Sequence, residues 1–316
     1  MYTSLTCPDS PTYSIMMADV MPDSNRKERL RGRFVGQNLH HVQTPSIVLD
    51  LAKLEVNCGR MLEATRRLDL LWRVHIKTHK TTELTRIQVG DKLNTPVSIM
   101  TSTVAEAEGI LPLLREYQAK GRNVNVLLAF PLFPSAAVRL SRLSSELGPG
   151  TVSVMIDHPD QLSSASAIAR APGGHPPLVF LKIDAGYGRA GVVPSSTACA
   201  ELIDAVLEAE LAGSCVFHGV YCHAGHSYGL RKDWEAMHYL AAEFAGLHGV
   251  ASYIRDRSPG HPLVLSVGAT PTATTIQHPT FSGAASSGAD APTREVETLF
   301  AELKAAGFQL EVHAGV

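Results

Sequence analysis

The sequence is poor in the features that mark membrane, nucleic-acid-binding and disulfide-stabilised proteins. No apolar run in its 316 residues approaches the ~20 residues needed to span a bilayer. Charge is nearly balanced, with 28 Lys and Arg residues against 30 Asp and Glu residues, which argues against a nucleic-acid or membrane partner. The 5 cysteines are scattered without a C-x-x-C pair, so neither a disulfide framework nor a zinc ribbon is expected.

The N-terminal region shows no targeting signal. It has no unbroken apolar core, which a secretory signal requires, and it contains Asp19, Asp23 and Glu28, whereas transit peptides avoid acidic residues. We therefore expect a cytoplasmic protein in which residues 1–40 form a loose N-terminal arm and residues 41–316 form the folded domain.

The rest of the chain alternates strand and helix patterns. Eight short apolar runs, rich in β-branched residues, predict strands that are buried on both faces. They are Arg73–Lys77, Val97–Ser102, Val124–Phe130, Val152–Asp157, Leu178–Asp184, Val216–His223, Leu263–Gly268 and Leu310–Val316. Apolar residues at helical spacing occur before the first of them, at Leu51–Leu62, and between most of the others, at Thr103–Gln118, Pro159–Arg170, Ser195–Glu210, Lys232–Ile254 and Val296–Leu303.

Eight strands at intervals of roughly 30 residues, as a barrel of about 250 residues requires, predict an α/β fold of the (β/α)8 TIM-barrel type. A doubly wound parallel sheet is the alternative. The chain stops within the eighth predicted strand, at Val316, which suggests a fragment of a longer protein. The segment Thr270–Pro292, rich in Pro, Thr, Ser, Gly and Ala, is expected to be a mobile loop.

Four clusters of chemically active residues follow predicted strands, and in a barrel such positions share one face. The first is His75–Lys80, where Lys77 at the tip of a buried strand favours the neutral amine that a Schiff-base lysine needs. An exposed loop lysine is the alternative. The second is Lys182–Gly191, where glycines around Tyr187 and Arg189 either allow close approach to a ligand or form a plain turn.

The third cluster, His218–Gly229, contains His223 and His226 but no carboxylate at a spacing that completes a metal site, so ligand-facing or packed histidines are expected. The fourth, Ser266–Thr272, is a small-residue turn after the seventh strand, where barrels commonly bind phosphate; a structural turn is the alternative. An amine at one strand end and a phosphate cradle on the same face are what pyridoxal 5′-phosphate (PLP) demands.

These segments resemble the fold-type III PLP enzymes. The resemblance is strongest to the eukaryotic-type D-serine dehydratases, followed by the D-threonine aldolases, with the alanine racemase N-terminal barrel more distant. Thr44–Asp50 and His75–Lys80 carry the resemblance first, and Asp184–Gly191, His223–Tyr228 and Ser266–Thr272 follow in the same order. The match covers about residues 42–316, which is the folded domain expected above, and it is specific as a set.

The resemblance assigns roles to individual residues. Lys77, and not Lys80, matches the lysine that forms the Schiff base with PLP. Positions that line the cofactor match Tyr187, Arg189, His223 and Tyr228, and the phosphate-binding turn matches Gly268, Ala269 and Thr270. The implied function is a PLP-dependent lyase of D-amino acid metabolism that converts D-serine to pyruvate and ammonia. A homodimer is the assembly that the resemblance implies, and the partner of the pyridine nitrogen stays open.

In the family, a β-rich C-terminal domain follows the barrel and supplies His and Cys ligands to a zinc ion that helps hydroxide to leave. This chain stops at Val316, before that domain. The resemblance therefore predicts a cofactor pocket without metal ligands, which puts the activity of this chain in question. The alternatives are a D-threonine aldolase-like lyase, a non-catalytic PLP-binding barrel, or a truncation product without function.

Overall fold

The computed structural model describes residues 26–283 and 290–315. The chain divides into two compact units, Met1–Asp50 and Leu51–Val316. The described part of the first unit contains helix α1 (Arg26–Phe34) and the short 3-10 helix η2 (Leu39–His41), so part of the expected loose arm is helical. Residues 1–25 of that arm lie outside the described part. The candidate site belongs entirely to the second unit.

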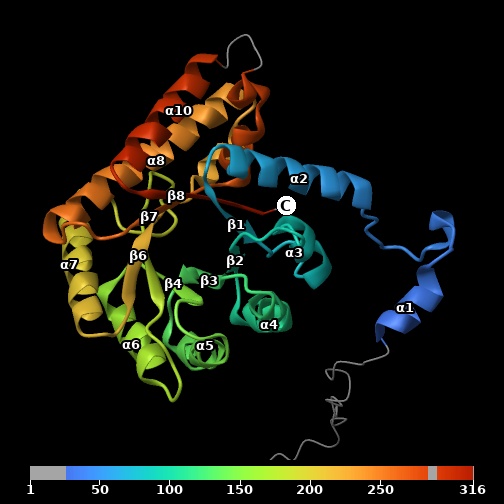
Figure 1. The fold of residues 1–316 in the computed structure, drawn as a ribbon, viewed down its shortest axis with the longest axis horizontal. Coiled ribbons are helices and arrows are strands. Elements are labelled where there is room, and N and C mark those ends of the chain that lie inside the picture. The colour runs from blue at the N-terminus through green and yellow to red at the C-terminus, as the bar shows by residue number, and fades with distance from the viewer. Residues whose placement is uncertain (1–25, 284–289, 316) are drawn as a thin grey trace, which may run out of the picture. The chain divides into compact units, whose positions relative to one another are not determined.

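The second unit contains a closed barrel of eight parallel strands, which follow one another in chain order (Figure 1). They are β1 (Leu71–His75), β2 (Val97–Thr101), β3 (Val124–Pro131), β4 (Val152–Ile156), β5 (Leu178–Lys182), β6 (Val216–Tyr221), β7 (Val264–Val267) and β8 (Gln309–Ala314). Strand β1 pairs with both β2 and β8, which closes the sheet. The (β/α)8 prediction is thus confirmed, and the doubly wound alternative, whose sheet is open, is excluded.

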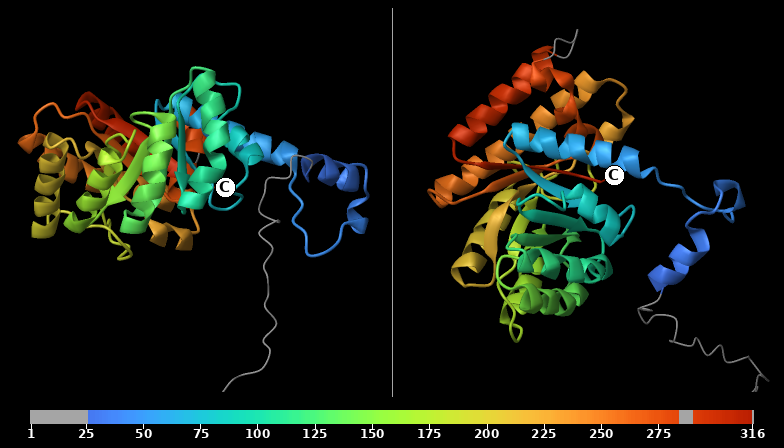
Figure 2. Two further views of the ribbon diagram at one scale, coloured as in Figure 1. Left: turned by 90° about the horizontal axis from the view of Figure 1, so that it is seen from below. Right: turned by 45° about the vertical axis from the view of Figure 1, so that its right-hand side comes forward.

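Helices cover the outside of the barrel (Figure 2). The long ones are α2 (Leu51–Arg67), α4 (Val104–Ala119), α5 (Pro134–Leu147), α6 (Leu162–Arg170, after η3 at Pro159–Gln161), α7 (Thr197–Leu211), α8 (Asp233–Arg257) and α10 (Asp290–Ala305). Helix α5 and the short α3 (Thr82–Gln88) were not predicted from the sequence. Ser and Ala dilute the apolar stripe of α5, although its Leu140, Leu143 and Leu147 are buried. No helix in the described ranges is long and apolar enough to cross a membrane.

The expected loop Thr270–Pro292 is largely made of short helices. Within it lie α9 (Thr270–Thr274), η5 (Thr275–Gln277) and η6 (Pro279–Ser282), and α10 begins at Asp290. The prediction of a continuous loop is therefore wrong. Small residues and prolines are compatible with short helical turns, because Pro fits the first position of a helix. Residues 284–289 of this segment lie outside the described part.

Two layers of apolar side chains form the core. The larger layer lies between the strands and the surrounding helices. A smaller cluster fills the barrel and consists of Met100, Leu127, Met155, Phe180, Tyr221 and Val264. Since side chains alternate along a strand, one set of residues faces the helices and the other faces the barrel interior.

The barrel interior also contains a buried ion pair. Arg73 of β1 donates from Nε to Oε1 of Glu311 on β8 at 2.8 Å, and each side chain is only 2% exposed. Asn125 accepts a further hydrogen bond from the Arg73 guanidinium at 2.7 Å, and Ser266 donates to Glu311 at 2.6 Å. These partners compensate part of the cost of removing two charges from water.

This arrangement predicts a strong effect of removing one charge. Glu311→Gln should destabilise the protein by roughly 3–5 kcal/mol, because it leaves Arg73 buried without a counterion. The double variant Arg73→Met, Glu311→Met should recover most of that loss. Urea-induced unfolding measures both. Glu146→Gln, which removes the partner of Arg115 in an exposed pair, is the control and should leave the midpoint unchanged. A double variant as unstable as the single one would contradict the argument.

Candidate functional site

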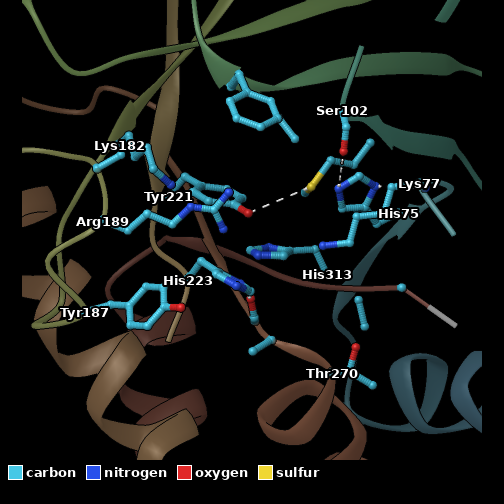
Figure 3. A pocket seen from close by; sticks show the side chains of 18 of the residues that line it. His75, Lys77, Ser102, Lys182, Tyr187, Arg189, Tyr221, His223, Thr270 and His313 are labelled. Atoms are coloured by element: carbon cyan, nitrogen blue, oxygen red, sulfur yellow. Dashed lines mark hydrogen bonds between the residues drawn. The ribbon is translucent and has the colours of Figure 1, made fainter. Parts of the chain in front are cut away.

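A cavity of about 380 Å³ opens at the C-terminal ends of the strands (Figure 3). Its volume is within the usual range for small-molecule sites, ~300–1,000 Å³. All of the residues predicted from the sequence line it, namely Lys77, Tyr187, Arg189, His223, Tyr228, Gly268, Ala269 and Thr270. Segments that are up to about 190 residues apart in the chain thus meet at one place because the barrel closes.

The two lysines of the first cluster lie in different environments. Strand β1 ends at His75, and Lys77 follows it with an exposed side chain that lines the cavity. Lys80 has a positive φ of 52°, pairs with Glu106 at 3.7 Å and lines a separate cavity. The geometry therefore separates the two lysines, but the expectation that Lys77 is desolvated on a buried strand is wrong.

The desolvated lysine of the cavity is Lys182, at the end of β5. Burial lowers the pKa of its amine, and the charge of Arg189 acts in the same direction. Its Nζ lies 4.8 Å from the centre of the Tyr221 ring, within range of a cation–π contact. Figure 3 shows Lys182 and Arg189 on one side of the cavity and Lys77 on the other. Positive charge is therefore available on both sides.

The loop after β5 is held by Asp184, the second residue beyond the strand. Asp184 Oδ1 accepts hydrogen bonds from the backbone N–H groups of residues 186–188 at 2.9–3.0 Å. This folds the glycine-rich segment into a compact turn that presents Tyr187 and Arg189 to the cavity. At Gly225 an added Cβ would lie 2.5 Å from the Tyr187 ring, so glycine is required there for the ring to pack.

The turn after β7 gathers small polar groups. Gly268 has φ 147°, and an added Cβ would lie 2.2 Å from the carbonyl oxygen of His313 in β8. The turn and β8 therefore approach each other more closely than any larger residue at position 268 would permit. The Tyr228 hydroxyl donates to Thr270 Oγ1 at 3.3 Å and accepts the backbone N–H of Thr270 at 3.4 Å. The N–H of Ala269 donates to Thr272 Oγ1 at 2.9 Å. The hydroxyl proton of Thr270 can thus be offered to an anion directly, whereas the Thr270 N–H and the Tyr228 hydroxyl must first exchange the bonds that they make to each other.

Three histidines line the cavity, and burial lowers the pKa of each. The pKa of His75 falls to about 4, with the nearby Lys77 as the second cause, and that of His313 falls well below its usual value. His223 donates from Nδ1 to the carbonyl of Gly268 at 2.6 Å. All three rings are therefore neutral near pH 7, and His223 keeps Nε2 as an acceptor.

Several lining residues had no site role in the sequence-based prediction. Among them are His75, Lys182 and Tyr221, which lie within the clusters named above, and His313, which lies outside them. They occupy strands or strand ends rather than loops. A signal was present, because Arg73 and His75 on β1, and Glu311 and His313 on β8, are polar residues at alternate positions of apolar strands. Such alternation marks the inward face of a barrel strand. His313 stacks on Tyr221 with ring centres 4.3 Å apart, and its Nε2 is buried without a hydrogen-bond partner.

A buried acid lies outside the cavity. Glu243 on α8 is 2% exposed, and its Oε1 accepts the backbone N–H of Ala224 at 2.8 Å. Burial raises the pKa of this carboxyl to about 7, against the opposing effects of the Thr272 hydroxyl and the Ala224 and Gly268 amides. It therefore titrates near neutral pH, unlike an ordinary glutamate.

The described residues offer no evident metal centre. Within the ranges 26–283 and 290–315, no three His, Cys, Asp or Glu side chains are grouped so that they could hold a metal ion. The zinc site that the resemblance implies for the family therefore has no matching donor set among these residues.

Comparison with known proteins identifies the family. The family model described as alanine racemase, N-terminal domain, matches residues 49–285. A D-serine dehydratase from Schizosaccharomyces pombe is 35% identical over 265 residues, which are 81% of this chain and 61% of that protein. One from Saccharomyces cerevisiae is 28% identical, over 78% of this chain and 60% of that protein. The solved structure of D-threo-3-hydroxyaspartate dehydratase from Delftia sp. HT23 has a TM-score of 0.63 at 25% identity, over 87% of this chain and 61% of that one. This chain belongs to the alanine racemase N-terminal domain family, and it spans about 60% of the length of these relatives.

The buried carboxyl of Glu243 predicts a pH-dependent stability. Its folded pKa of about 7 exceeds the unfolded value near 4.5, so its stabilising contribution is complete below 4.5 and is lost as pH rises through 7. The loss amounts to roughly 3 kcal/mol. The free energy of unfolding of Glu243→Gln, relative to that of the parent, should therefore be higher at about pH 8 than at about pH 5. Urea unfolding at both pH values measures this, and a constant difference between the two proteins would contradict it.

Proposed function

We propose that this member of the alanine racemase N-terminal domain family is the PLP-binding barrel of a D-serine dehydratase-type lyase, with Lys77 as the residue that binds the cofactor covalently. One observation carries the proposal: the exposed side chain of Lys77 and the Gly268–Thr270 turn line the same cavity. The similarity to D-serine dehydratases supports D-serine as the substrate.

The residues present fit PLP. A phosphate group needs hydrogen-bond donors and positive charge. The Thr270 hydroxyl can donate to it directly, and the Thr270 N–H and the Tyr228 hydroxyl can do so when they exchange the hydrogen bonds that they make to each other. Lys182 and Arg189 add positive charge on the cavity wall. The close approach at Gly268, where a Cβ would meet β8 at 2.2 Å, keeps this turn free of side-chain bulk. We assign the phosphate of PLP to the turn Gly268–Thr270.

The chemistry then depends on a few side chains. When bound, PLP supplies a conjugated ring that takes up the electron pair left on the Cα atom of an amino acid. The amine of Lys77, once released from the cofactor, is the base that removes the Cα proton of the D-amino acid. Neutral His223 and His75 can exchange hydrogen bonds with a ligand without adding charge. The described residues contain no group of side chains that could coordinate a zinc ion, and we propose no step that uses one.

The lysine assignment is tested by chemical labelling. Sodium borohydride fixes PLP permanently to the lysine that holds it, and peptide mapping locates the label. We expect one label, on Lys77, because its side chain is exposed within the cavity that holds the phosphate turn. Lys77→Ala should lose the label, whereas Lys80→Ala should keep it, since Lys80 pairs with Glu106 and lines another cavity. A label on Lys182, or one retained in Lys77→Ala, would overturn the assignment.

Substrate tests separate the candidate activities. The labelled site and the release of pyruvate from D-serine would support the dehydratase. Cleavage of D-threonine to glycine and acetaldehyde, without pyruvate from D-serine, would identify a D-threonine aldolase-like lyase instead. A label on Lys77 with neither product would identify a PLP-binding barrel without catalysis. Circular dichroism of each variant controls for folding.

A further inference from the structure

The carboxyl of Glu243 supports the chain segment that carries His223. Its Oε1 accepts the backbone N–H of Ala224 at 2.8 Å, one residue beyond His223. The imidazole of His223 in turn donates from Nδ1 to the carbonyl oxygen of Gly268 at 2.6 Å. The carboxyl, the histidine and the turn after β7 therefore form one connected unit, of which Glu243 alone does not line the cavity.

The same carboxyl is connected to the turn after β7. Helix α9, which begins in this turn at Thr270, packs against α8, and the hydrogen bonds of Ala224 and His223 join the carboxyl to Gly268. Its second oxygen, Oε2, is buried without a hydrogen-bond partner. The Thr272 hydroxyl and the Gly268 amide favour its ionised form. A negative charge on Glu243 therefore acts directly on the turn to which we assigned the phosphate, in an interior where charges are weakly screened.

The other titratable groups near this carboxyl do not share its behaviour. At the end of β6 and directly after it, burial raises the pKa values of Tyr221 and Cys222 well above their usual range, so both are neutral. From β5, Lys182 acts on Cys222 as a cation. The turn after β7 contributes the neutral Thr272 hydroxyl and the Gly268 amide. Glu243 is the acidic group of this set that gains or loses a proton near neutral pH.

We propose that Glu243 is a positioning residue that couples phosphate binding at the turn Gly268–Thr270 to its own protonation. The carboxyl accepts the Ala224 N–H in both protonation states, but only its ionised form repels a dianion held at the turn. The inference rests on the proposed function, because it takes the phosphate site from there.

Thermodynamic linkage between phosphate binding and the protonation of Glu243 has a measurable consequence. If ionised Glu243 weakens phosphate binding, bound phosphate must raise the pKa of Glu243 by the same factor. The protein then takes up a proton from solvent when the ligand binds above about pH 7. A ligand with the same ring but no phosphate should cause no proton uptake, since it places no dianion at the turn.

Pyridoxine 5′-phosphate is a suitable probe because it has the ring and the phosphate but no aldehyde, so it cannot react with Lys77. Its affinity is measured by calorimetry at about pH 6 and pH 8.5 for the parent chain, Glu243→Gln and Asp256→Asn. Asp256 is an exposed acid on the same helix. The phosphate of the ligand also titrates between these pH values, but it does so equally with both proteins. Its effect therefore drops out when the parent is compared with Glu243→Gln. We expect the affinity of the parent, divided by that of Glu243→Gln, to be roughly tenfold lower at pH 8.5 than at pH 6. Asp256→Asn should bind as the parent does at both pH values.

Proton uptake provides a second and independent measurement. Binding heats in two buffers of different ionisation enthalpy should show proton uptake by the parent near pH 7.5, none by Glu243→Gln, and none for pyridoxine without phosphate. An unchanged affinity ratio or an absence of uptake by the parent would overturn the inference, while binding itself would still support the cofactor site. Absence of binding to any of the three proteins would overturn the proposed function and the inference together.

Discussion

The closure of the barrel between β1 and β8 is the constraint on which the rest of the structure depends, and the ion pair between Arg73 and Glu311 lies at this seam. The two residues are 238 positions apart in sequence and belong to β1 and β8. Closure brings the segment after β1, which carries Lys77, beside the end of β8, which carries His313. A sheet left open at this seam would leave the cavity without one of its walls.

The pair also connects the interior to the site. Ser266 donates to Glu311 at 2.6 Å and contacts Nδ1 of His313 at 3.1 Å. Since the serine proton is used on the carboxylate, the imidazole must donate from Nδ1, which leaves Nε2 as a buried acceptor. Burial keeps this ring neutral. A stabilising element of the barrel thus also determines which histidine tautomer is present at the cavity.

The strands and most helices could be predicted from sequence because their signals are local: runs of apolar residues and helical spacing. The loop residues of the site could be found for a similar reason, since the glycines around Tyr187 and Arg189 are local as well. Whether a particular lysine, such as Lys77 or Lys182, is buried could not be predicted from the sequence. The chain leaves the sheet after Ile76, whose N–H still pairs with β2, and turns back through the hydrogen bond from Lys80 N to Ile76 O at 2.8 Å. That turn exposes Lys77, whereas Lys182 at the end of β5 is half-buried, and both outcomes depend on tertiary contacts.

The environment of Glu243 could be predicted from the sequence only in part. Its place in α8 was readable, because it lies next to Phe244 and at helical spacing from Leu240 and Leu247, all three of which are buried. An acid on an apolar helical face implies a buried partner, but the partners, Ala224 and the Gly268 turn, come from two other segments. The cost of burying this acid falls on the folded state as the pH rises, whereas glutamine would keep the acceptor without the charge. A titratable acid at this position is therefore explained by what it does to the two turns rather than by stability.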